Sequence, residues 1–145
     1  MSEVVARARS DLYALKILRS HGMPAEDLNR VCSATLTARL TYASPSWRGF
    51  CNKSDIDRLE AVQRKARHWG FSCGQGNIIN ALIDQADKKL FGKVLASRDH
   101  VLHPLLPPVK ATTHNLRSRG HDRQLPTKTN LSSCNFIMRM IYSTI

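Results

Sequence analysis

The chain has 145 residues, of which 42% are hydrophobic, and this size suits one small domain with a modest core. Its net charge of +11 favours a polyanionic partner, because cationic groups placed near phosphates release condensed counterions. No apolar run is long enough to span a membrane, and no secretory signal is present. We therefore expect no membrane partner and an intracellular location, nuclear or cytoplasmic.

The cysteines and histidines give no sign of a metal site. Cys32, Cys51, Cys73 and Cys134 lie far apart and form no Cys-x-x-Cys pair, which indicates reduced thiols, with Cys32 packed in a helix face. The histidines lack cysteine or carboxylate neighbours at ligand spacing. We expect neither a metal nor a cofactor.

The basic residues are concentrated towards the C-terminus. Residues 1–109 carry 16 basic and 10 acidic side chains, whereas residues 110–145 carry 6 basic and 1 acidic side chain. Most aliphatic residues lie in the first segment. This difference indicates a folded front part followed by a basic, weakly hydrophobic tail.

Periodicity predicts a first helix over about residues 3–20, ended by His21 and Gly22, and a second helix that begins at Pro24. The apolar arc of the second helix covers more than half of its circumference, so we expect it at the centre of a bundle. Arg39 lies inside this arc. It is either a snorkelling or ion-paired side chain, or a cation held for a phosphate.

Pro45 ends the second helix, and the aromatic residues Tyr42, Trp47 and Phe50 surround the turn. Such a cluster near basic residues could stack on nucleobases. Aromatic clusters more often fill the core where two helices meet, and packing is the interpretation we favour here.

The third helix is predicted to begin at Ser54, with Asp57 as the acid of a capping box. Its acidic side chains lie in the first half, so the second half is purely cationic. This bias complements the helix dipole, and it also suits contact with phosphates. The candidate nucleic-acid-binding residues of this helix are Arg58, Arg64, Lys65, Arg67 and His68.

A fourth amphipathic helix is predicted over about residues 77–97, with its lysines on a solvated face where Asp84 and Asp87 offset them. Residues 100–113 contain three closely spaced prolines and are interpreted as a linker. Residues 114–145 form a basic tail with further candidate phosphate ligands at Arg117, Arg119 and Arg123. Apolar residues from Phe136 to Ile141 predict a short terminal helix that docks on another surface.

The sequence thus predicts an all-α fold. Residues 1–99 form a small bundle of about four helices, residues 100–113 form the Pro-rich linker, and residues 114–145 form a largely extended basic tail with a short terminal helix. Short connections between the helices indicate antiparallel neighbours.

Four sequence segments carry a resemblance to a known family. They are RLTYASPSW at 39–47, DIDRLEAVQRKARHWGF at 55–71, HNLRSRGHDRQLP at 114–126 and SSCNFIMRMIY at 132–142. In this order they resemble the region after the catalytic palm in reverse transcriptases of non-LTR retrotransposons, the jockey-like and LINE-type elements. The resemblance implies that residues 1–109 correspond to thumb and post-thumb helices, which grip a template–primer duplex.

Catalysis by the chain itself is not expected. Nucleotidyl transfer needs carboxylates that hold two metal ions, and the sequence has no Asp-Asp pair. We expect instead a non-catalytic fragment of an RNA-directed DNA polymerase that binds RNA or DNA through phosphates, without sequence preference and without a small-molecule substrate. Other parts of a retroelement polyprotein are further possible partners. The alternatives are a helical protein-interaction module and a translated relic of a decayed element.

Overall fold

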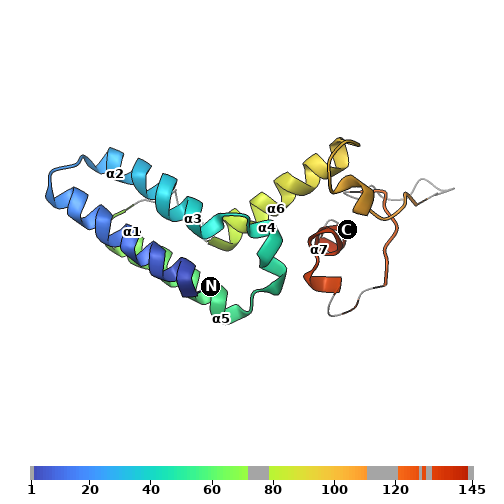
Figure 1. Ribbon diagram of the computed structural model, residues 1–145, viewed down its shortest axis with the longest axis horizontal. Helices are drawn as coiled ribbons and strands as arrows, with labels where there is room; N and C mark the ends of the chain where they lie inside the picture. Colours follow the sequence, from blue (N-terminus) through green and yellow to red (C-terminus); the bar gives the residue numbers. More distant parts are fainter. Residues whose placement is uncertain (1, 72–78, 111–120, 128, 130–131, 144–145) are drawn as a thin grey trace. The chain divides into compact units, whose positions relative to one another are not determined.

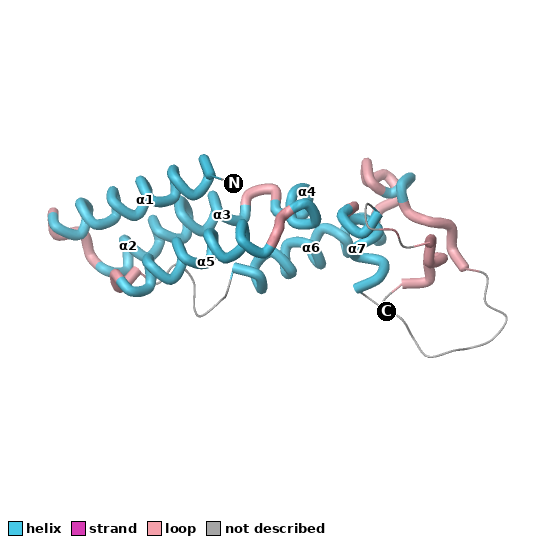
Figure 2. Tube along the Cα trace, turned by 90° about the horizontal axis from the view of Figure 1, so that it is seen from below, coloured by secondary structure: helices cyan, strands magenta, loops and turns pink. Residues whose placement is uncertain are grey.

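A computed structural model describes residues 2–71, 79–110, 121–127, 129 and 132–143 (Figure 1). This described part is mostly helical and contains no β-strand, in agreement with the predicted all-α class (Figure 2). The chain divides into two compact units. Unit 1 comprises residues 1–43 and 51–83, and unit 2 comprises residues 44–50 and 84–145. The division therefore falls inside a helix, whereas the sequence places the bundle boundary at residue 99.

Unit 1 is built from α-helices that pack along their lengths. The helix α1 contacts α2, the adjoining π-helical turn η1, α3 and α5. In both views α1 and α5 run in the same direction, and α2 to α3 runs back along them (Figures 1 and 2). The elements are α1 (Ser2–Ser20), α2 (Ala25–Cys32), η1 (Ser33–Thr37), α3 (Ala38–Thr41), α5 (Lys53–His68) and the start of α6 (Ile79–Ala96).

The predicted apolar faces form the core of unit 1. Leu12 and Leu15 of α1, Leu36 of η1 and Leu59 of α5 are almost completely buried. Burial of one such leucine contributes about 1.5–3 kcal/mol to folding. The predicted second helix corresponds to α2, η1 and α3. Its apolar arc packs inside this unit, because Leu28, Cys32, Leu36 and Leu40 are all buried.

Both α1 and α5 end in a glycine with a positive φ angle. Gly22 has φ of 86° and Gly70 has φ of 80°, a conformation that costs glycine little. At each end the glycine N–H bonds to the carbonyl three residues back. The next N–H bonds to the carbonyl five residues back, from Met23 to Leu18 and from Phe71 to Ala66. The predicted stop at His21 and Gly22 agrees with this geometry.

Several local predictions require correction. Asn52, and not Ser54, caps α5, because its Oδ1 accepts a hydrogen bond from the Asp55 N–H at 2.8 Å. Tyr42 and Phe50 are 80% and 69% exposed, so these two aromatic residues do not fill a core, whereas Trp47 is half-buried. Cys32 is disulfide-bonded, contrary to the prediction of a reduced thiol, whereas Cys51 and Cys134 form no disulfide.

Arg39 forms an internal ion pair. Its Nε donates to Asp11 Oδ2 at 2.7 Å and its Nη2 to Asp11 Oδ1 at 3.3 Å, so the guanidinium is held by both carboxylate oxygens. This hydrogen bond and the carboxylate charge raise the pKa of Arg39 above its usual value. The internal ion pair, one of the interpretations left by the sequence, is therefore present.

Unit 2 contains the second part of α6 and a terminal helix that packs against it. The apolar face of α7 contributes Ile137, Met140 and Ile141 to a cluster with Phe91 and Val94 of α6. The expected terminal helix is therefore present, and its apolar face is covered inside this unit. The other elements are α4 (Ser44–Trp47), η2 (Arg48–Phe50), η3 (His103–Leu105), η4 (Ser132–Cys134) and α7 (Phe136–Ser143).

A charged residue interrupts the apolar stripe of α6. Asp87 is 4% exposed and lies between Ile83 and Phe91 on the buried side of the helix. The sequence places Asp87 on the solvated face, where it would offset lysines, and this prediction is wrong. Arg139 of α7 donates to its carboxylate at 2.8 Å, which explains why an acid is tolerated at this position.

Candidate nucleic-acid interface

The parallel arrangement of α1 and α5 gathers cations at one end of unit 1. A helix C-terminus carries partial negative charge and favours basic side chains in its last turns. Because α1 and α5 run in the same direction, the basic last turns of both helices lie at the same end (Figure 1). We call this set the cationic end; it consists of Lys16, Arg19, Arg64, Lys65, Arg67 and His68.

Trp69 lies at the centre of the cationic end. Its ring is half-buried, and the Lys65 ammonium lies 4.7 Å from the ring centroid. The Lys16 ammonium, from α1, lies 5.9 Å from the same centroid. Both distances fall within the roughly 6 Å reach of a cation–π interaction. Trp69 therefore links the cations of two helices that are remote in sequence.

Arg19 fixes the end of α1 against the end of α5. Its Nη1 donates to the Trp69 carbonyl oxygen, and its guanidinium carbon lies 5.0 Å from the centroid of the buried Phe71 ring. This carbonyl is one of those left without a helical partner at a helix end. Arg19 thus has a structural contact, and its charge still contributes to the local field.

The predicted residues of α5 all have exposed side chains. Arg67 and His68 lie in the last turn, and Arg58 lies earlier on the helix. Arg64 is 3.9 Å from Glu60, but its side chain is 62% exposed, and such surface pairs contribute about 0–1 kcal/mol. Glu60 also accepts a hydrogen bond from Asn80 at 2.7 Å. Arg64 can therefore exchange its partner for a phosphate at low cost.

The candidates in the tail have a different placement. The Arg123 side chain is 15% exposed and donates to the Pro107 carbonyl oxygen at 3.2 Å. It lies where residues 109 and 123 form an antiparallel bridge. This position suits a structural role better than phosphate contact. Arg117 and Arg119 lie outside the residues that the structure describes.

Sequence reasoning missed Lys16 and Arg19 as partners of the α5 cations. They are 53 and 50 positions away from Trp69, the residue at the end of α5 that both of them contact. The sequence does show that Lys16 and Arg19 lie near the end of the first predicted helix. It also shows that the end of the third predicted helix is basic. These two basic ends are close in space only because the helices pack in the same direction, and the sequence does not specify that direction.

Acidic residues near the start of α2 have partners of their own. Arg30 donates to Asp27 at 3.3 Å and also to Glu26, and both interactions lie within one turn of helix. Among the described residues, no group of three or more histidine, cysteine, aspartate or glutamate side chains could hold a metal ion. None of the described helices combines the length and apolarity needed to span a bilayer.

Comparison of the chain with models of protein families, with curated proteins and with solved structures found no match in any of the three.

Proposed function

We propose that the chain binds nucleic acid through the phosphate backbone at the cationic end, without sequence preference and without catalysis of its own. The observation that carries the proposal is the meeting of Lys16 and Lys65 at Trp69, because it unites the basic ends of two helices. Exposed lysine and arginine side chains contact phosphate oxygens but carry little base-edge information.

The resemblance to non-LTR reverse transcriptases supplies the ligand class. In this proposal the chain descends from the thumb and post-thumb region of such a polymerase, and its ligand is a template–primer duplex. A compact helical unit with a cationic end supports a role in gripping backbone. RNA–DNA hybrids have an A-like shape that proteins contact mainly through phosphate and sugar groups.

The basic tail is assigned a supporting role. We infer that Arg117 and Arg119 add nonspecific phosphate contacts. The high positive charge and low apolar content of this part of the sequence support that role. Arg123 is excluded from this set because of its contact with Pro107.

The decisive experiment is fluorescence-anisotropy titration of the full chain with a labelled RNA–DNA hybrid, from about 50 to 200 mM salt. We expect binding that weakens steeply with salt. A variant with Arg64→Gln, Lys65→Gln and Arg67→Gln should bind at least about tenfold more weakly, since three charge-assisted interactions are removed. Its salt slope should flatten by about one for each phosphate that is no longer neutralised.

The matched control is Lys88→Gln with Lys89→Gln and Lys93→Gln. These lysines are also exposed on a helix, α6, and the control removes the same number of positive charges. Equal weakening by both variants would indicate attraction to net charge alone and would contradict a localised interface. A complex that is insensitive to salt, or a stable homodimer without nucleic acid, would favour the protein-interaction module.

A further inference from the structure

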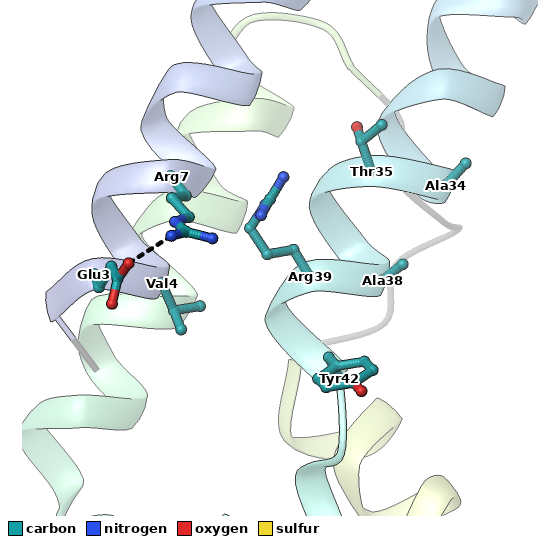
Figure 3. A pocket seen from close by; sticks show the side chains of 8 residues that line it. All are labelled: Glu3, Val4, Arg7, Ala34, Thr35, Ala38, Arg39 and Tyr42. Atoms are coloured by element: carbon teal, nitrogen blue, oxygen red, sulfur yellow. Dashed lines mark hydrogen bonds and ion pairs between the residues drawn. The ribbon is translucent and has the colours of Figure 1, made fainter.

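A groove of about 650 Å³ lies between the first half of α1 and the segment from η1 to α3 in unit 1. This volume lies within the range of roughly 300–1,000 Å³ that is common for small-molecule sites. Figure 3 shows the side chains around it. They are Glu3, Val4, Arg7, Ala34, Thr35, Ala38, Arg39 and Tyr42.

Two guanidinium groups reach into the groove from opposite sides. Arg7 extends from α1 and Arg39 from α3, and both side chains point into the space between the helices (Figure 3). Guanidinium groups present planar sets of N–H donors that match the oxygens of a phosphate. A pair of them on facing walls favours an anion between them.

The two arginines differ in how firmly they are held. Arg39 is fixed by both oxygens of Asp11, whose side chain is 19% exposed. Arg7 pairs with Glu3 at 2.6 Å, but both side chains are largely exposed, at 64% and 76%. An exposed pair of this kind contributes little to stability. Arg7 can therefore leave Glu3 for an incoming anion, while Arg39, held in place by Asp11, offers its remaining N–H donors at a fixed position.

The remaining walls suit a flat, partly apolar group. The Tyr42 ring is 80% exposed and lies at one end of the groove (Figure 3). Exposed aromatic rings stack on nucleobases, with a contribution of about 1–3 kcal/mol per base. Ala38 precedes this ring by about one turn, and its small side chain leaves room there (Figure 3).

The backbone along the groove is also unusual. Residues Ser33–Thr37 form a turn of π-helix between two α-helical segments. Turns of π-helix are rare in proteins overall, but those that do occur are frequently found at functional sites. Here the wider turn carries Ala34 and Thr35, two of the lining residues.

We propose that this groove binds a nucleoside monophosphate, with the phosphate between Arg7 and Arg39 and the base stacked on Tyr42. The site lies near the start of α1, whereas the cationic end lies at the C-terminus of the same helix. The inference does not rest on duplex binding. It requires only the two guanidinium groups, the exposed ring and the space between them.

The test is isothermal titration calorimetry of the full chain with adenosine monophosphate, adenosine and inorganic phosphate. Arg7→Gln should weaken binding of adenosine monophosphate about tenfold. Arg9→Gln is the matched control, since Arg9 is exposed on the same helix but does not line the groove, and it should change affinity less than about twofold. Glu3→Gln should tighten binding about twofold to threefold, because it removes the competing carboxylate. Tyr42→Ala should reduce affinity to that of inorganic phosphate.

The opposite signs expected for Arg7→Gln and Glu3→Gln separate a binding site from a structural effect, which would weaken binding in both. Circular dichroism confirms that each variant keeps its helices. Absence of binding by the unmodified chain would overturn the proposal. Equal losses from Arg7→Gln and Arg9→Gln would also overturn it, as would binding of inorganic phosphate as tight as that of adenosine monophosphate.

Discussion

Asp87 and Arg139 are 52 positions apart, and the Arg139 Nη2 donates to the Asp87 Oδ2 at 2.8 Å inside unit 2. The Asp87 side chain is 5% exposed and that of Arg139 is 22% exposed. The pair joins α6 to α7 next to the apolar cluster that contains Phe91 and Ile141. A charge in that position is tolerated only because its partner is present.

Removal of Arg139 should therefore destabilise unit 2 strongly. Arg139→Met leaves the Asp87 carboxylate buried without its cation, which typically costs about 3–5 kcal/mol. The double variant Asp87→Leu with Arg139→Met should recover most of that loss, because an apolar pair needs no desolvated charge. Urea denaturation followed by circular dichroism measures both values. A loss below about 1 kcal/mol for Arg139→Met would show that the pair contributes little.

Gly49 should not tolerate a side chain. A Cβ atom there would lie 2.0 Å from the Cys134 carbonyl oxygen, a backbone atom that cannot move aside cheaply. Gly49→Ala should destabilise the protein by about 1–3 kcal/mol in thermal or urea unfolding. The control is Gly92→Ala in α6, where nothing lies within 4 Å of the added atom. That variant should be about 0.5–1 kcal/mol more stable, since alanine favours a helix interior. Similar effects from both substitutions would contradict the observed contact.

The cap of α5 distinguishes the structure from the sequence prediction. Asn52→Ala removes the side-chain acceptor for the Asp55 N–H and should cost about 1 kcal/mol. Ser54→Ala should cost less than about 0.5 kcal/mol, because Ser54 is an exposed helical residue. Thermal unfolding of the two variants measures the difference. If Ser54→Ala were the more damaging change, the helix would begin where the sequence predicted.

The bond between Arg39 and Asp11 should be stronger than a pair within one helix. A double-mutant cycle with Arg39→Gln and Asp11→Asn should give a larger coupling energy than an exposed pair within one helix, because two hydrogen bonds are made in a partly buried position. The same cycle on Arg30 and Glu26 should give about 0.3–0.5 kcal/mol, since those side chains are largely exposed. Equal coupling energies would mean that the two-hydrogen-bond geometry of Arg39 and Asp11 does not strengthen their interaction.

Local features of the fold could be predicted from the sequence. The first helix was expected over residues 3–20 and extends over Ser2–Ser20. The fourth was expected over residues 77–97, and α6 extends over Ile79–Ala96. These elements follow from a 3.6-residue apolar period and from glycine stops, both of which are encoded within a few neighbouring residues.

Features that depend on distant residues could not be predicted in this way. Asp87 was placed on the solvated face because acids are rarely buried, and its partner Arg139 belongs to a segment interpreted as tail. The packing direction of α1 and α5 was also unknown, so Lys16 was not associated with Trp69. Tyr42 was expected in the core, although it follows directly on the last residue of α3 and is exposed. Each error concerns tertiary packing, which local periodicity does not specify.

The C-termini of α1 and α5 lie together at the cationic end, and this affects how an anion can be held at that end. Two helices that finish side by side present carbonyl oxygens, so the main chain at the cationic end repels a phosphate. An anion at this place has to be held by long side chains, such as those of Lys16 and Lys65, and not by backbone amides. Acetylation of these lysines removes the charge without touching the helices. Chemical modification of these two lysines can therefore weaken the attraction of this surface for anions without a change in the fold.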